Sequence, residues 1–336
     1  MQITAPSRLP HSVRPSKVFE AYWRFAAERQ EIFFRRLSST EPPWTADPVL
    51  QAYRFTNVYR ASDRVSQYLI RNVAYAGDQS PRELFFRILL FKIFNRIDTW
   101  QLLTESLGQI SFAEYQFERY DAVLSGAMDE RRRIYSPAYI MPSAGPGIKK
   151  HRAYLKLIEQ MARDNIPERL QACRCMEEGF ALLRSYPMIG DFLAYQFIVD
   201  VNYSALTDIS EMEFVAPGPG TRDGIKKCFL DTGRFRDTDV IRMMADIQEE
   251  QFASMGILFR TLWGRRLQLA DCANLFCEVG KYARCTHPDV ADISGRTRIK
   301  QRFHANPEPI RYWFPPKWGT NHLLDTGACK QAAMTI

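Results

Sequence analysis

Leu183-Arg-Ser-Tyr-Pro-Met-Ile-Gly190, followed by Asp191-Phe-Leu-Ala-Tyr-Gln-Phe-Ile-Val-Asp200, predicts a helix, a tight hairpin and a second helix. Gly190 permits a close backbone approach and unusual dihedral angles, so the amides of Ile189 and Gly190 can face the phosphate of a nucleic acid. A Pro-x-x-Gly turn between two helices also occurs as a plain connector. The stretch therefore favours a nucleic-acid-binding protein, with the connector as the alternative.

The charge balance agrees with an anionic partner. The chain has 45 Lys and Arg against 38 Asp and Glu, a net charge of +7 and a pI of about 9.0. This excess is modest, so it indicates a groove with a few phosphate contacts and argues against a histone-like tail. With 46% hydrophobic residues among 336, we expect a substantial core in one large domain or two closely packed ones.

The sequence carries no apolar run of membrane-spanning length, and Met1 to Pro15 lack the apolar centre of a signal peptide. A cytoplasmic protein without a membrane partner is therefore expected. Its seven cysteines are an odd number in a large chain, which favours reduced thiols. Because the spacing of Cys272, Cys277 and Cys285 fits no common metal motif, we expect neither a metal site nor a cofactor.

The hydrophobic pattern is dominated by helical periodicity. It predicts helices over residues 149–163, 170–184, 191–200, 238–262 and 267–282. Asp47-Pro48 predicts the start of a long helix, and Ser80-Pro-Arg-Glu83 and Ser111-Phe-Ala-Glu114 have the pattern of capping boxes. Residues 138–141 give the best of a few short strand signals.

Four regions are expected along the chain. Residues 1–15 form a flexible N-terminus, and residues 16–147 form an N-terminal helical half with the base-pocket motif. The Pro- and Gly-rich residues 142–147 mark its joint to the helix-hairpin-helix half, 148–290. Residues 291–336 lose periodicity and gain prolines, so they predict an extended tail packed on the body.

The segment from Arg54 to Ser66 places aromatic rings, an amide and cations on about three helical turns, a mixture that can stack on and hydrogen-bond a base. Asn57 is the least easily explained residue, because an amide inside a helix lowers helix propensity. The alternatives are an ordinary Arg60–Asp63 ion pair and a core role for Phe55 and Tyr59.

A second segment joins acids to a glycine loop. Pro217-Gly-Pro-Gly220 cannot be helical, and Thr221 after it can cap a new helix. Such a loop feeding a helix is a candidate phosphate site, formed here by Gly218, Gly220, Arg222, Lys226 and Lys227. Glu211 and Glu213 precede the loop and can act as acid or base, the alternative being a solvated acidic turn. For Glu278 and Lys281, a surface ion pair is the favoured interpretation.

Five short motifs, taken in order, resemble those of a known family. They are Phe55-Thr-Asn-Val-Tyr-Arg60 with Asp63, Asp200-Val-Asn-Tyr-Ser204, Glu211-Met-Glu-Phe214, Gly218-Pro-Gly220, and Cys277-Glu278 with Lys281-Tyr282. They resemble the alpha-glutamyl/putrescinyl thymine pyrophosphorylase-like proteins of phage thymine hypermodification, over residues 17 to 290. This resemblance implies an all-α fold with few short strands, related to the helix-hairpin-helix DNA glycosylases.

The resemblance implies two activities. Phage members act on an activated 5-hydroxymethyluracil in DNA and install an amine or amino acid, whereas bacterial relatives excise a hypermodified base from phage DNA. In either case the base would turn out of the duplex and be held by Phe55, Asn57, Tyr59, Arg60 and Asp63.

The sequence departs from ordinary helix-hairpin-helix glycosylases in two places. Gly-Pro-Gly stands where they have an aspartate at a helix start, and no lysine follows Gly190. The catalytic acid must then come from Asp200, Asp208, Glu211 or Glu213, and we expect Glu211 or Glu213, with Asp200 third.

The leading hypothesis is a monofunctional DNA glycosylase of anti-phage defence that hydrolyses the N-glycosidic bond of a bulky modified base. The alternatives are a transferase that hypermodifies 5-hydroxymethyluracil-derived bases and a non-enzymatic sensor of modified DNA. Because no Gly-x4-Gly-Lys-Ser/Thr loop occurs, a self-contained kinase is not expected. The expected partner is double-stranded DNA containing modified bases, with no obligatory protein partner.

Overall fold

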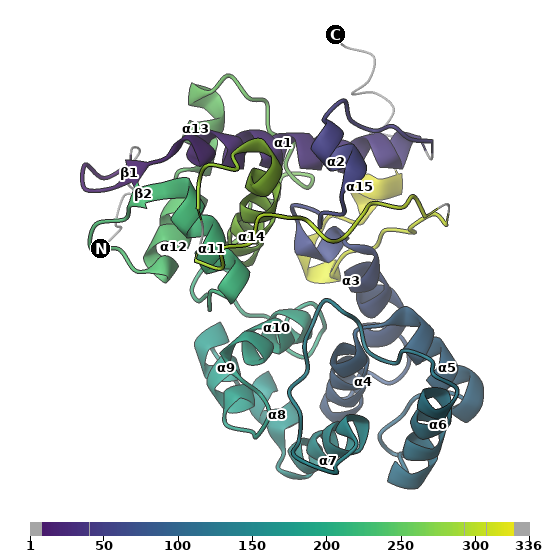
Figure 1. Ribbon diagram of the computed structural model, residues 1–336. Coiled ribbons are helices and arrows are strands. Elements are labelled where there is room, and N and C mark those ends of the chain that lie inside the picture. Colours follow the sequence, from purple (N-terminus) through teal and green to yellow (C-terminus); the bar gives the residue numbers. More distant parts are fainter. Residues whose placement is uncertain (1–8, 40, 292, 307, 326–336) are drawn as a thin grey trace. The chain divides into compact units, whose positions relative to one another are not determined.

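The computed structural model describes residues 9–39, 41–291, 293–306 and 308–325, and it is mostly helical (Figure 1). The expected all-α class is confirmed, with two short strands among the described residues. The chain forms two compact units. Unit 1 contains residues 1–63, 211–312 and 318–336, and unit 2 contains residues 64–210 and 313–317. Unit 1 is therefore discontinuous in sequence.

Unit 1 is built around α1 (Lys17–Ser38), α11 (Pro219–Cys228) and α14 (Leu269–Thr286), which lie side by side in Figure 1. Its smaller elements are β1 (Arg14–Pro15), α2 (Pro48–Ala52), η1 (Arg60–Ser62), β2 (Phe229–Asp231), α12 (Asp237–Asp246), α13 (Gln248–Ser254) and α15 (His322–Asp325). The apolar face of α1 packs onto α14, and the Tyr22 hydroxyl donates to the Cys272 carbonyl at 3.2 Å.

Two glycines let α11 and α14 approach closely. A Cβ on Gly224 would meet the Phe276 carbonyl oxygen at 1.9 Å, and one on Gly280 would lie 3.0 Å from the Gly224 Cα. Any side chain at Gly224 would therefore push the two backbones apart. This crossing fixes the position of α14, which carries the polar groups described below.

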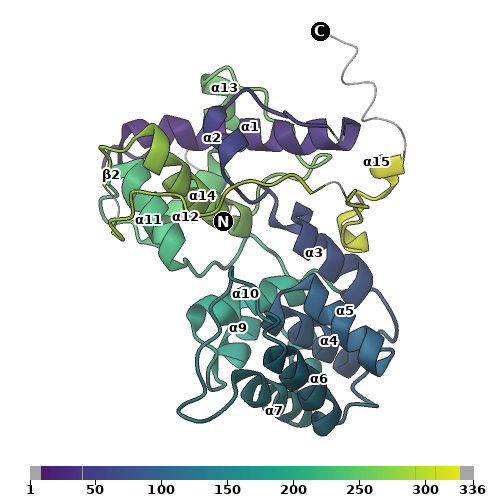
Figure 2. The same cartoon turned by 45° about the vertical axis from the view of Figure 1, so that its right-hand side comes forward.

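Unit 2 surrounds the buried helix α4 (Pro81–Phe94). Every residue from Glu83 to Phe94 is buried, because this helix is apolar on nearly all sides. Its other elements are α3 (Arg64–Tyr68), the π-helix η2 (Leu69–Ala74), α5 (Ile97–Leu107), α6 (Phe117–Asp129), α7 (Lys150–Arg163), α8 (Ile166–Gln171), α9 (Met176–Arg184) and α10 (Asp191–Val201). Figure 2 shows α4 among these helices. The 3-10 turn η3 (Pro316–Trp318) spans the point where the chain leaves unit 2.

Three of the five predicted helices occur as α7, α10 and α14. The helix predicted over 170–184 is interrupted between α8 and α9, and the one predicted over 238–262 is broken at Ile247 and ends at Ser254. Asp47 does cap a helix, accepting from the amides of Val49 and Leu50, but that helix has five residues and is not long.

The capping-box and strand predictions are largely wrong. Ser80 precedes α4 but makes no side-chain cap, because its side chain bonds to Asp78. Glu83 accepts from the Ser111 hydroxyl and from the amides of Phe112 and Ala113. No helix begins at Ser111, and α6 starts only at Phe117. Residues 138–141 form no strand.

Residues 142–147, predicted as the joint between two halves of the chain, lie inside unit 2. Residues 1–8 lie outside the described residues, whereas β1 pairs antiparallel with β2. In the C-terminal segment, the Phe303 amide donates to the Ala52 carbonyl and the Gln301 carbonyl accepts from the Arg54 amide.

Of the described helices, none has the length and apolar character needed to cross a membrane.

Candidate functional site

The segment from Phe55 to Asp63 is not helical, which corrects the sequence prediction. It runs without regular structure from Arg54 to Asn57 and then makes the 3-10 turn η1. Its side chains are nevertheless largely buried, including those of Phe55, Asn57, Tyr59 and Arg60. The physical reason is that the backbone groups of Thr56, Asn57 and Arg60 bond to side chains, mostly of α14, and not to a continuous helical ladder.

These α14 side chains form a polar face of Asp271, Asn274, Glu278 and Lys281. Their spacing places them on one side of the helix. Asp271 Oδ1 accepts from the Arg60 amide at 3.2 Å, and Asn274 Nδ2 donates to the Asn57 carbonyl at 3.2 Å. Glu278 Oε2 accepts from the Thr56 amide at 2.9 Å. The polar face therefore holds the segment in place.

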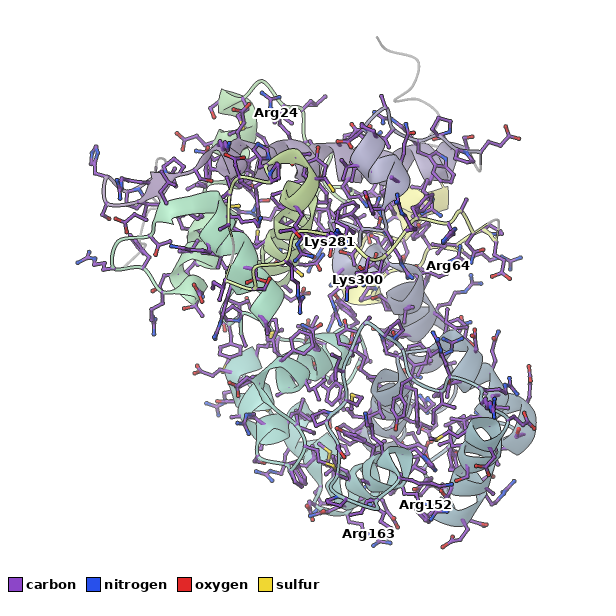
Figure 3. All side chains as sticks on the ribbon, viewed as in Figure 1. Arg24, Arg64, Arg152, Arg163, Lys281 and Lys300 are labelled. Atoms are coloured by element: carbon purple, nitrogen blue, oxygen red, sulfur yellow. The ribbon has the colours of Figure 1, made fainter. Side chains whose placement is uncertain are left out.

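The ion pair between Glu278 and Lys281 is present, with Nζ and Oε2 at 2.7 Å, but it is not the surface pair that the sequence favoured. Glu278 is 6% exposed, and Lys281, labelled in Figure 3, also lies 4.5 Å from the centre of the Phe55 ring. Sequence reasoning missed Asp271 and Asn274. The regular spacing of four polar residues on an otherwise apolar helix is the signal that identifies them.

The predicted base-binding residues lie together, but several are engaged within the protein. The Asn57 amide Nδ2 donates to the Ser62 carbonyl at 2.8 Å, and the Asn57 backbone amide donates to Asp63 Oδ1 at 2.8 Å. Phe55 packs edge-on against Phe25, and the Tyr59 hydroxyl donates to a backbone carbonyl. These contacts suit the core alternative for Phe55 and Tyr59, and base binding stays a prediction.

Two buried carboxyl groups, Asp63 at the end of this segment and Asp271 on α14, have raised pKa values. Burial raises the pKa of Asp63 to about 6, against the opposing effects of the Asn57 amide and Arg29. Burial, with a contribution from the charge of Glu211, raises the pKa of Asp271 to about 7. Carboxyl groups of this kind are typical of acid–base sites, although buried structural networks show them too.

The three predicted catalytic acids have different surroundings. Glu211 is half-buried in unit 1, where its Oε1 lies 2.6 Å from Arg265 Nη2, and the Arg265 guanidinium stacks 3.7 Å from the centre of the Trp318 ring. Glu213 is exposed. Asp200 lies in unit 2 and is buried against Lys92, with Oδ2 and Nζ at 2.7 Å.

The glycine loop differs from its prediction. Gly218 is the N-cap of α11, so the helix begins at Pro219 and Thr221 does not cap it. A Cβ on Gly220 would meet the Cys277 Sγ at 2.5 Å, which assigns that glycine to helix packing. Arg222 and Lys226 are exposed.

Lys227 is 3% exposed, and its Nζ donates to the Val290 carbonyl at 2.6 Å; phosphate contact by this residue stays a prediction that its burial does not favour.

The hairpin lies in unit 2, between the end of α9 at Arg184 and the start of α10 at Asp191. Gly190 is exposed, with an ordinary φ of −82°, and the residue with positive φ is Met188, at 65°. The predicted unusual dihedral angles of Gly190 are therefore wrong. Ile189 is buried, and phosphate contact by the amides of Ile189 and Gly190 stays a prediction.

Two cavities were not foreseen from the sequence. The larger of the two, in unit 1, measures about 460 Å³, and we call it the aromatic cavity. Its lining consists of Arg29, Ile32, Arg36, Pro42, Pro43, Trp44, Thr45, Leu50, Gln51, Tyr53, Phe55, Phe303 and Ala305. The smaller, in unit 2, measures about 260 Å³ and includes Arg96, Arg132 and Arg133. Among the described residues, no group of three or more His, Cys, Asp or Glu side chains is placed to hold a metal ion.

The fold and the sites define an all-helical protein with buried carboxyl groups and clustered arginines. Residues 16–292 match the family described as 5-hmdU DNA kinase, helical domain, and the chain belongs to this family. It is also 26% identical over 323 residues to the 5-hmdU DNA kinase of Bacillus phage SP10, an alignment that covers 89% of this chain and 50% of that protein. The chain thus spans half the length of this relative, and no solved structure matches it.

These matches correct the leading hypothesis. A kinase transfers a phosphoryl group and does not hydrolyse an N-glycosidic bond, so the predicted glycosylase activity, with its base flipping and excision, is wrong. The resemblance to proteins of phage thymine hypermodification is confirmed, whereas membership of the helix-hairpin-helix glycosylase superfamily is not supported. The transferase alternative fits the matches better.

Proposed function

We propose that this chain acts in a transferase reaction on 5-hydroxymethyluracil in DNA and recognises the DNA that carries this base. The proposal is supported by the family match, which extends over residues 16–292. A kinase acting on this base would transfer a phosphoryl group to its hydroxymethyl oxygen. Because the chain has no Gly-x4-Gly-Lys-Ser/Thr loop, we assign to it the recognition of the acceptor DNA rather than of the phosphoryl donor.

Exposed cations suit the DNA backbone. In unit 2, Arg132 and Arg133 are exposed and line the smaller cavity together with Arg96. In unit 1, Arg222 and Lys226 are exposed on α11. We propose that these groups contact phosphates, which would place the protein on DNA without reading its sequence.

Among the predicted acids, we propose Glu211 as the group that accepts the proton of the attacking hydroxyl. Its side chain is 9% exposed, Arg265 holds it in one orientation, and its charge contributes to the raised pKa of Asp271. Asp200 is engaged in a buried ion pair, and Glu213 is exposed and forms no ion pair within the described part of the chain.

The proposal is tested by fluorescence anisotropy with two duplexes that differ in a single base, 5-hydroxymethyluracil or thymine. We expect tighter binding of the modified duplex. Arg132→Gln with Arg133→Gln should weaken binding of both duplexes and reduce the salt dependence by about one counterion per lost contact. Arg163→Gln, at an exposed arginine of α7 labelled in Figure 3, is the matched control. Equal affinity for the two duplexes would contradict the proposal.

A second measurement addresses the chemistry. The modified duplex is incubated with ATP, digested to nucleosides and analysed by mass spectrometry. A nucleoside heavier by one phosphate would contradict the assignment of this chain to the acceptor DNA alone, and the loss of that product with Glu211→Gln would support Glu211 as the base. An unchanged nucleoside, with selective binding retained, assigns this chain to recognition alone.

A further inference from the structure

The aromatic cavity of unit 1 is formed by segments far apart in the sequence: α1, the loop and helix around α2, and residues near Phe303. The hydrogen bonds of Arg54 with Gln301 and of Phe303 with Ala52 join the last two of these. Its volume of about 460 Å³ lies within the usual range for small-molecule sites. The cavity is therefore large enough for a ligand and is built by tertiary packing.

Flat rings make up much of the cavity wall. Trp44, Tyr53, Phe55 and Phe303 all line it, and Trp44 meets Phe303 edge-to-face with ring centres 6.3 Å apart. Tyr53 is half-buried, and the Arg302 guanidinium lies 4.7 Å from the centre of its ring. Aromatic faces of this kind accommodate planar ligands, including nucleobases, by stacking.

Two arginines supply the only charged side chains in the described lining, and no acidic residue is part of it. The Arg36 guanidinium lies 4.8 Å from the centre of the Trp44 ring. Arg29 is 7% exposed; its Nε donates to the Thr56 carbonyl and its Nη2 to the Phe55 carbonyl. Its buried Nη1 has no hydrogen-bond partner among the described residues.

The electrostatics of the lining favour an anion. Burial lowers the pKa of Arg29; Asp63 opposes this shift, and the positive charge of Arg36 adds to it. Two like charges in a poorly solvated wall repel each other, and a bound anion would relieve this repulsion. Guanidinium groups bind phosphate oxygens particularly well because they present paired donors.

We propose that the aromatic cavity binds a planar base linked to a phosphate ester, with the base against Trp44 and Tyr53 and the phosphate near Arg36 and Arg29. This chemistry describes both a free nucleoside monophosphate and a phosphorylated base within DNA. The inference goes beyond the proposed function, because a site for a free nucleotide does not require DNA binding.

The test is isothermal titration calorimetry with dUMP, deoxyuridine and inorganic phosphate. We expect dUMP to bind at least tenfold more tightly than either fragment, since each fragment makes only one of the two kinds of contact. Arg36→Gln should weaken dUMP binding at least tenfold. Arg24→Gln is the matched control: Arg24 lies on the same helix, is exposed and pairs with Glu20 outside the cavity.

A second pair of probes separates the two sources of the ligand. A short oligonucleotide with one 5-phosphomethyl-deoxyuridine is titrated alone and in competition with dUMP. Binding of the oligonucleotide alone, if abolished by Arg36→Gln, identifies the ligand as DNA-linked, and competition by dUMP identifies a site open to free nucleotides. Thermal unfolding confirms that each variant folds. The proposal is overturned if neither probe binds, or if Arg36→Gln binds both as tightly as the parent protein.

Discussion

Replacing Asp200 with Asn would leave the Lys92 ammonium buried without its carboxylate. The two side chains are 1% and 4% exposed in unit 2, and their Oδ2 and Nζ atoms are 2.7 Å apart. Removing one member of such a pair typically costs about 3–5 kcal/mol. Lys92 keeps a hydrogen bond to Asn95 at 3.3 Å and lies 4.1 Å from the centre of the Tyr139 ring. Because Lys92 keeps these two contacts, we expect Asp200→Asn to lower the free energy of unfolding by about 3 kcal/mol, near the lower end of that range.

The assay is equilibrium urea denaturation of the parent protein, Asp200→Asn and the double variant Lys92→Met/Asp200→Leu. The double variant should recover most of the lost stability, because no buried charge remains. As a control, Asp98→Asn removes an exposed partner of Arg96 and should cost less than about 1 kcal/mol. A loss below about 1 kcal/mol for Asp200→Asn would refute the structural role and return Asp200 to the catalytic candidates.

Three further predictions concern unit 1. Gly224→Ala should lower the thermal midpoint sharply, because its Cβ would meet a backbone carbonyl at 1.9 Å, whereas Gly126→Ala, with open space, should not. Asp271→Asn should reduce the pH dependence of stability between about pH 4 and pH 7. Burial raises the pKa of folded Asp271 to about 7, whereas the unfolded group loses its proton near 3.8. The folded state therefore binds more protons in this window, so the free energy of unfolding of the parent protein falls as the pH rises. Unchanged pH dependence would contradict that shift. Glu278→Ala should speed hydrogen exchange at the Thr56 amide, and unchanged protection would refute its anchoring role.

Local sequence signals predicted the elements whose stability comes from their own residues. The helices α7 and α10 and the cap at Asp47 follow from apolar spacing and from the side chain of one residue. The Arg54 to Asp63 segment could not be predicted in this way. Its amides bond to Asp271 and Glu278, more than 200 residues away, and helical periodicity carries no information about such partners.

The candidate site was predicted only in part. The sequence pointed to Asn57, Asp63 and Glu211, which the structure places in one unit, but it did not show that Lys227 is buried with its Nζ donating to the Val290 carbonyl. The aromatic cavity had no motif at all, because its arginines and rings come from three separate stretches. The family match, rather than any single residue, separated base modification from base excision.

The discontinuity of unit 1 has a consequence for synthesis of the chain on the ribosome. The apolar face of α1 packs on α14, and Tyr22 and Cys272 are separated by 250 positions. At translation rates of about 5–20 residues per second, α1 must wait roughly 10–50 s for its partner. Most of unit 2, residues 64–210, emerges during this interval. The nascent chain therefore exposes Tyr22, Trp23 and Phe25 throughout that period, which makes α1 the expected contact for ribosome-associated chaperones.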